Sequence, residues 1–217
     1  MKKAFMVLMV FALSTTLIYS QDEEESTGVG SGDLLIEITG TPFSGNSLLN
    51  FGQFRARYFL SETIVPRLGF FMDLNNVQNT PDVVSNNSTY TFMPGAEYHL
   101  QSEGSFRSYA AFDAIIGWNS RNLQSTSGPT VEGSLTVPTS ANQSLTRGYF
   151  DLGVQLSAGA DYHFNSRFYI GAEIGFQLLR RTHSEVTVDG DVYQKSTVSS
   201  FGDVNIGNSF RVGFKLF

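Results

Sequence analysis

The strongest constraint on the fold of this chain is an alternation of apolar and polar residues that continues for unusually long stretches. In residues 147–164 the even positions read Gly, Phe, Leu, Val, Leu, Ala, Ala, Tyr, Phe, and the odd positions read Arg, Tyr, Asp, Gly, Gln, Ser, Gly, Asp, His. A period of two is that of a β-strand, whose successive side chains point to opposite faces. Ordinary strands have about 3–10 residues. The pattern therefore predicts a very long strand with two chemically opposed faces.

The same alternation occurs in eight segments, each with one face that carries no charge. Their apolar sets span Leu34–Ile38, Phe54–Leu60, Ile64–Leu74, Tyr90–Leu100, Ala110–Trp118, Phe150–Phe164, Phe168–Leu178 and Val204–Leu216. The chain is therefore predicted to be all-β.

The opposite faces carry the charges in balanced number. The acids are Glu37, Asp73, Glu97, Asp113, Asp151, Asp161, Glu173 and Asp203, and the bases are Arg55, Arg57, Arg67, Arg107, Arg147, Arg167, Arg211 and Lys215. A balanced, arginine-rich face is typical of an enclosed space where charges must pair. We interpret this face as the inside, with Arg107 and Arg167 as candidate partners of the acids on 147–164.

The connections between the segments alternate in length. Short ones at 61–62, 101–105 and 165–166 alternate with longer ones near 40–49, 75–88, 120–146 and 181–200. Short turns at one end and long loops at the other are typical of membrane barrels. The pattern predicts a closed, antiparallel, up-and-down barrel of eight strands. Asp189-Gly190 is a hairpin signal, so the last loop is expected to continue as a two-stranded extension.

In such a barrel the uncharged face contacts lipid, and aromatic side chains gather at both water interfaces. The sequence places aromatic residues at both ends of the apolar series. The predicted belts consist of Tyr90, Trp118 and Phe150 on the long-loop side and of Tyr58, Tyr98, Tyr162, Phe164, Phe168 and Phe214 on the short-turn side.

The N-terminal residues read as a secretory signal at 1–20, with Lys2 and Lys3 before an apolar core, followed by a flexible acidic leader at 21–33. A membrane anchor is the alternative for 1–20. Removing these residues takes two lysines and no acid, so the net charge changes from −6 to −8. An acidic chain argues against a nucleic-acid partner. The absence of cysteine excludes disulfides and thiol chemistry.

Over residues 33–217 the chain resembles the small eight-stranded outer-membrane barrels of the OmpA/OmpX-like group. The signal, the alternation, the loop pattern and a final strand "SFRVGFKLF" carry the resemblance. It implies a barrel domain at 34–217 in the bacterial outer membrane, inserted by the barrel-assembly machinery, without a C-terminal peptidoglycan-binding domain. The sequence departs from the family in one respect. Arg211, Gly213 and Lys215 share the phase of Phe217, so Phe217 is either an additional residue or follows a bulge.

Pro66 and Pro94 fall inside predicted strands, where proline removes a hydrogen bond of the sheet. If residues 74 and 89 face each other, Pro94 lies opposite Gly69 and Pro66 opposite Glu97. We hypothesise a bulge or distortion toward the short-turn end.

The sequence gives little sign of catalysis. The only imidazoles are His99, His163 and His183, and adjacent His183 and Ser184 would point to opposite faces. No ligand spacing for a metal is present, and we expect no catalytic, cofactor or metal residues.

The predicted role is structural: an outer-membrane anchor that contacts lipid and lipopolysaccharide and presents its loops to protein partners. Such an anchor is expected to serve as an accessory subunit of a larger assembly, as an adhesin or as an envelope-stability protein. The alternatives are a narrow ion or solute channel, a lipid-modifying enzyme, and a secreted lipocalin-like barrel with the apolar face inward.

Overall fold

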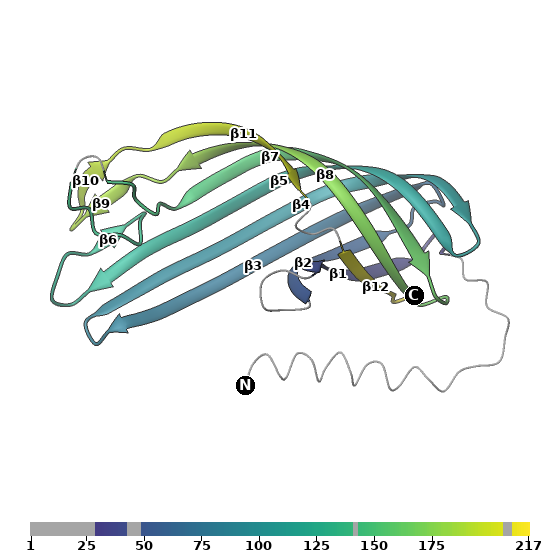
Figure 1. The fold of residues 1–217 in the computed structure, drawn as a ribbon, viewed down its shortest axis with the longest axis horizontal. Helices are drawn as coiled ribbons and strands as arrows, with labels where there is room; N and C mark the ends of the chain where they lie inside the picture. The colour runs from purple at the N-terminus through teal and green to yellow at the C-terminus, as the bar shows by residue number, and fades with distance from the viewer. Residues whose placement is uncertain (1–28, 43–48, 141–142, 206–209) are drawn as a thin grey trace.

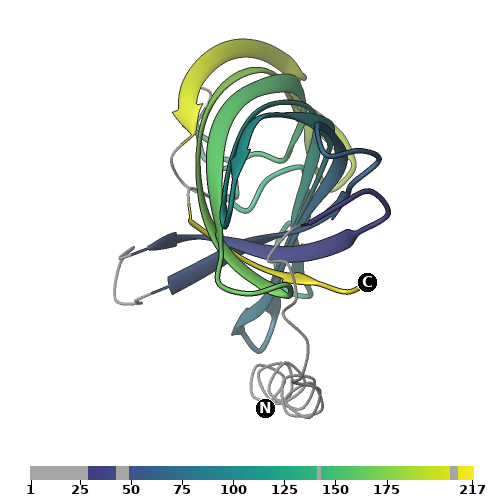
Figure 2. The same cartoon turned by 90° about the vertical axis from the view of Figure 1, so that its right-hand side faces the viewer.

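The protein is an eight-stranded antiparallel barrel (Figures 1 and 2). The computed structural model describes residues 29–42, 49–140, 143–205 and 210–217. The wall strands are β1 (Leu34–Pro42), β2 (Leu49–Tyr58), β3 (Ile64–Thr80), β4 (Val83–Glu103), β5 (Phe106–Ser125), β7 (Tyr149–His163), β8 (Phe168–His183), and β11 (Thr197–Asn205) with β12 (Phe210–Lys215), which both pair with β8. Pairing of β1 with β12 closes the ring. The predicted fold class is therefore confirmed.

The strands are longer than the predicted segments at the long-loop end. β3 reaches Thr80 and β4 begins at Val83, so most of the expected loop at 75–88 is a regular hairpin. β5 likewise extends to Ser125. Polar alternation in these stretches hid the strands from a search for apolar faces. The remaining connection between β5 and β7 contains the short strand β6 (Val131–Glu132).

The predicted hairpin at Asp189-Gly190 is confirmed. It joins β9 (Val186–Val188) to β10 (Asp191–Gln194). Both turn residues have positive φ, 51° and 90°, which is the backbone of the two-residue turn that matches strand twist. β6 pairs with both β5 and β9, so β6, β9 and β10 extend the wall beyond the membrane. Leu123, Val131 and Val186 pack together beneath this extension.

The distortion proposed at the prolines is confirmed in part. Pairing of β4 with β5 lapses at Met93 and Pro94 and shifts in register between His99 and Gln101, toward the short-turn end. No bulge lies at either proline in the pairing of β3 with β4. Pairing of β3 with β4 keeps one register from Ile64↔Tyr98 to Gln78↔Val84, with Pro66 opposite Ala96 and Pro94 opposite Leu68. Pairing of β4 with β5 has the same register on both sides of Pro94, at Phe92↔Ile116 and Gly95↔Asp113. The missing N–H is therefore accommodated as a local gap in the ladder, without an extra residue.

Between β3 and β11, where β2, β1 and β12 form the wall, the described residues are not paired over the full height of the barrel. Among these residues β2 pairs with β3 only from Phe54↔Phe70 to Arg57↔Arg67. Within the described ranges, β11 pairs only with β8. Figure 2 shows β1 and β2 extending outward to the left, away from the ring. Both faces of β11, and those of β3 beyond Phe71, are therefore exposed.

The chain just before β1 closes the short-turn end of the barrel. Val29 is 2% exposed and packs with Leu35, Phe59, Val65 and Tyr169. Gly32 N donates to Phe59 O at 2.8 Å. Residues 29–33, expected in a flexible leader, are thus packed against the barrel, because an apolar valine caps its mouth. The expected signal at 1–20 and the rest of the leader, 21–28, lie outside the described residues.

The register of β12 shows whether Phe217 is an additional residue or follows a bulge. β1 and β12 pair without a shift from Gly40↔Phe210 to Leu35↔Lys215. Phe217 follows the strand end and its carbonyl accepts from Leu34 N at 2.9 Å. Phe217 is therefore an additional residue beyond the last strand. Among the described residues, no helix has the length and apolar character needed to cross a membrane.

Candidate functional site

The outer surface of the barrel is apolar. In β5, β7 and β8 every exposed large apolar side chain is at an even position, and the odd positions point inward. Exposed apolar surface on this scale is unfavourable in water and is expected where lipid covers it. The soluble, lipocalin-like alternative therefore does not hold. An apolar exterior around a polar, filled interior is the arrangement of bacterial outer-membrane barrels, and the protein is located there.

Aromatic side chains lie near both ends of this surface. Tyr90, Trp118 and Phe150 are in register on three neighbouring strands, and the Tyr90 and Trp118 rings stack 5.3 Å apart. At the short-turn end the Phe168 and Phe214 rings are 5.1 Å apart. Tyr58, Tyr98 and Tyr162 are also exposed at this end. Their amphipathic rings suit the two water interfaces.

The interior holds a cluster of buried charges, which we call the charge network. Its arginines and carboxylates are all 7% exposed or less. They are Arg55, Arg57, Arg67 and Arg211, with Glu37, Glu97, Asp113, Asp161 and Glu173. Alternation places them inside because all have odd numbers.

Each arginine of the charge network contacts at least two carboxylates. Arg57 Nη2 lies 2.5 Å from Glu97 Oε2, and its Nη1 lies 2.8 Å from Asp161 Oδ2. Arg67 lies 2.5 Å from Asp113, 2.7 Å from Glu173 and 3.1 Å from Glu97. Such shared, partly bidentate contacts use the planar guanidinium fork, which lysine lacks.

The remaining two arginines connect the other side of the lumen. Arg55 lies 3.0 Å from Glu37 and 3.1 Å from Glu173. Arg211 lies 2.5 Å from Asp161 and 3.5 Å from Glu37. The nine residues come from all eight wall positions: β1, β2, β3, β4, β5, β7, β8 and β12. The charge network therefore joins all eight wall positions across the lumen.

Two tyrosines complete the charge network and pack onto glycines. Tyr109 donates to Glu173 Oε2 at 2.6 Å, and Tyr169 donates to Glu37 Oε2 at 2.7 Å. Tyr109 is in register with Gly159, and Tyr169 with Gly213. A Cβ at Gly213 would lie 2.0 Å from Tyr169 Cζ. The glycines on the polar face thus make room for rings that fill the lumen.

Further layers lie toward the long-loop end. Met93, Ile115 and Leu179 form a buried apolar cluster. Beyond it, Arg181 lies 2.7 Å from Asp151, and its guanidinium stacks 3.7 Å from the Tyr149 ring centroid. The interior of this barrel is filled by side chains in successive layers, as expected for eight strands.

Several residues predicted for the interior charges do not join the charge network. Asp73 and Asp203 are exposed, because they lie where the wall between β3 and β11 is unpaired. Arg107 is buried in the interior as predicted, but it donates to the carbonyl of Val29 at the barrel mouth. Arg147 donates to the carbonyls of Ser184 and Lys195 in the outer extension. Arg167 lies in the β7–β8 turn and Lys215 pairs with Asp33 at 2.9 Å.

The pairing partners suggested for the acids on β7 were also wrong. Asp161 contacts Arg57 and Arg211 rather than Arg107, although Arg107 is opposite it in the sheet. Asp151 pairs with Arg181, which sequence reasoning missed. Arg181 has the inward, odd phase, and that signal could have identified it. The sequence did not identify Tyr109 and Tyr169 as members of the charge network, because these residues are neither charged nor on the lipid-facing side.

All three histidines lie within the described residues, and each is held by different neighbours. His99 Nε2 lies 3.0 Å from Glu97 within the lumen, and the His163 ring stacks on Tyr169 at 5.0 Å. His183 ends β8, whereas Ser184 contributes backbone contacts to Gly148 and Arg147. In the part of the chain that is described, no three metal-ligating side chains gather.

Comparison with known proteins yields fold likenesses only. No family model matches the chain. No curated protein matches it either. Similar solved structures include the N-terminal β-barrel domain of Pseudomonas aeruginosa OprF, with 16% identity, a TM-score of 0.44 and coverage of 87% of this chain and 100% of that one. The outer membrane protein OprG from the same organism has 10% identity, a TM-score of 0.47 and coverage of 88% and 99%. Ail, the attachment invasion locus protein of Yersinia pestis, has 10% identity, a TM-score of 0.41 and coverage of 86% and 99%.

Proposed function

We propose that this protein is a non-conducting outer-membrane anchor that presents a structured outer platform to a protein partner, as an accessory subunit of a larger outer-membrane assembly. The observation that carries the first part is the charge network, whose side chains join all eight wall positions across the lumen. A lumen filled in this way is suited to rigidity rather than to conduction. Neither an enzymatic role nor a cofactor is part of the proposal.

The platform consists of β6, β9 and β10 with the connection around them. It is held to the barrel by the apolar cluster Leu123, Val131 and Val186 and by Arg147, which donates to Ser184 O and Lys195 O. Thr130 N donates to Asp189 Oδ1 at 2.9 Å, which fixes the hairpin turn. An ordered extension offers a pre-formed surface, which reduces the entropy lost when a partner binds.

The tip of the platform carries exposed apolar side chains that the fold does not use. Val192 and Tyr193 on β10 are 54% and 41% exposed. In the described chain β10 pairs only with β9, so its other edge is free. A free strand edge with exposed apolar side chains is a recognised mode of binding an extended segment of another protein. Outer-leaflet lipid, including lipopolysaccharide, would surround the wall below, and the barrel-assembly machinery would insert the chain.

Conductance in planar lipid bilayers tests the sealed lumen. The purified protein should give no stable current steps, because the charge network fills the lumen. The double variant Glu173→Ala/Asp161→Ala removes two carboxylates that link opposite walls. It is the positive control, in which current steps are expected. Stable open steps from the unaltered protein would contradict the anchor proposal and favour the channel.

Crosslinking after mild detergent extraction tests the platform. A partner should crosslink to the native protein, and the variant Val192→Ser/Tyr193→Ser should lose it. Gln78→Ser/Asn79→Ser, at the tip of the β3–β4 hairpin, is the control and should retain the partner. A monomer without any crosslinked protein, or equal loss in both variants, would overturn the subunit role.

A further inference from the structure

Away from the strand ends, one residue breaks the rule that separates charge from lipid in this barrel. The charged residues of the wall strands in the described ranges all have odd numbers, except Arg180 on β8. Glu103, at the short-turn end of β4, follows a register shift and lies opposite the outward-facing Phe106. Arg180 is exposed and follows Phe176 and Leu178 on the lipid-facing side. A cation on this face is unfavourable in the hydrocarbon region, most strongly at the midplane and much less near the interfaces. Its position along the strand is therefore informative.

Arg180 lies at the outer water interface. It is twelve residues beyond Phe168, whose ring belongs to the aromatic belt at the short-turn end. Twelve residues extend about 40 Å along a strand, and a tilt of about 40° reduces this to about 30 Å along the barrel axis. The apolar band of such barrels is about 25 Å tall. The guanidinium is thus at the level of the lipid headgroups on the long-loop side.

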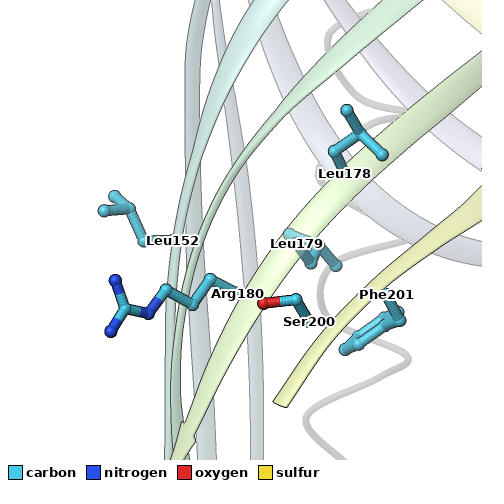
Figure 3. A pocket seen from close by; sticks show the side chains of 6 residues that line it. All are labelled: Leu152, Leu178, Leu179, Arg180, Ser200 and Phe201. Carbon is cyan, nitrogen blue, oxygen red and sulfur yellow. The ribbon is translucent and has the colours of Figure 1, made fainter. Parts of the chain in front are cut away.

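The surroundings of Arg180 form a groove of about 450 Å³ that is open to the outside (Figure 3). It is lined by Leu152, Leu178, Leu179, Arg180, Ser200 and Phe201. β7 and β11 flank β8 here, with Leu152 and Ser200 both in register with Arg180. Figure 3 shows the Arg180 side chain extending away from β8, with its guanidinium near Leu152. The groove therefore combines apolar walls with one cation and one hydroxyl.

Arg180 has no partner among the described residues. The ion pairs of the barrel wall lie in the interior, and Asp151, the nearest acid by register on β7, is paired with Arg181. A guanidinium that is left without a carboxylate at the headgroup level is complementary to a phosphate, which it can contact with two parallel N–H groups. The apolar lining is complementary to acyl chains.

We infer that this groove is a binding site for a phosphorylated glycolipid of the outer leaflet, of the lipid A type, with its phosphate on Arg180 and an acyl chain along Leu152 and Leu178. This site deepens the proposed function, since it rests on the long loops facing the cell exterior. The Ser200 hydroxyl is placed to contact the phosphate or the sugar. The site would hold the barrel in a defined lipid environment beside the unpaired edge of β11.

Native mass spectrometry of the purified protein in detergent tests the site with lipid A as the probe. The native protein should retain lipid A that carries its phosphates and lose most of it when the phosphates are removed. Arg180→Gln should weaken retention about fivefold, the contribution of a single basic residue beside an anionic lipid surface. Arg180→Lys should keep most of the binding because it keeps the charge.

Arg167→Gln is the matched control, since it removes the same charge at the opposite end of the barrel and should bind as the native protein does. Equal binding by Arg180→Gln, equal weakening by Arg167→Gln, or equal retention of dephosphorylated lipid A would each overturn the inference. Competition by inorganic phosphate at the lipid concentration would also overturn it, because the site would then take a free anion.

The native protein's preference for phosphorylated lipid can be measured even if a variant fails to fold. The result is independent of the conductance and crosslinking tests, so failure here leaves the proposed function intact.

Discussion

At the scale of single residues, the fold depends on how buried charges are shared. Arg57 is fully buried, contacts Glu97 and Asp161, and lies within 6 Å of the ring centroids of Phe59, Tyr109 and Tyr169. Loss of one member of such a group leaves its partners as unpaired charges in a water-poor interior, which costs more than the contact itself stabilises.

Replacing Arg57 with methionine should therefore destabilise the barrel strongly. We expect the free energy of unfolding to fall by about 3–5 kcal/mol, the range for breaking a buried ion pair from one side. Urea titration of the protein folded into lipid vesicles measures it. Arg167→Met, in the β7–β8 turn, should change the same quantity by less than about 0.5 kcal/mol. Comparable losses in both variants would show that the charge network contributes no special stability.

The glycines that receive the two tyrosines give a second prediction at this scale. Gly213→Ala would place a methyl group 2.0 Å from Tyr169 Cζ and displace the hydroxyl that donates to Glu37. We expect a loss of about 1–3 kcal/mol, as for other overpacked cores. Gly30→Ala is the control, since no heavy atom lies within 4 Å of its added Cβ. Unchanged stability of Gly213→Ala would mean that the Tyr169 ring can move without cost.

At the scale of elements, the barrel and its outer extension are held by different interactions. The wall strands β4 and β5 pair from Val83↔Ser125 to Glu103↔Phe106, with a gap at Met93 and Pro94 and a register shift after His99. β9 and β10 are short and depend on a turn whose two residues have positive φ. The extension should therefore open independently of the barrel.

Gly190→Ala tests that independence. Gly190 has a φ of 90°, a conformation that costs an L-residue about 1–2 kcal/mol. Hydrogen exchange at Val188 and Val192 should become faster, whereas the free energy of unfolding of the barrel should stay within about 0.5 kcal/mol of the native value. Asp191→Ala, at the adjacent position, should leave exchange unchanged. A loss of barrel stability as large as that of Gly213→Ala would show that the two parts unfold together.

At the scale of the whole molecule, alternation predicted the membrane-spanning parts of the strands and the face that each strand turns to lipid, because period two leaves no freedom in which side chains share a face. The alternating loop lengths added the ring. Alternation could not predict which charges meet. Asp161 was assigned to its neighbour in the sheet, Arg107, but the tilt of the strands brings it to Arg57 and Arg211 across the lumen. Alternation also could not predict that the described wall between β3 and β11 is unpaired toward the long-loop end, because this depends on where β1 and β2 leave the ring.

The central claim is that the even face of the wall contacts lipid and the odd face fills the interior. A single-cysteine spin-label scan of residues 152–158 on β7 tests it most directly, because the chain has no native cysteine. In lipid vesicles, labels at Leu152, Val154, Leu156 and Ala158 should collide with dissolved oxygen, and labels at Gly153, Gln155 and Ser157 should be shielded from oxygen and from a water-soluble relaxer. The opposite phase, or water-soluble relaxer reaching the even positions, would contradict the account.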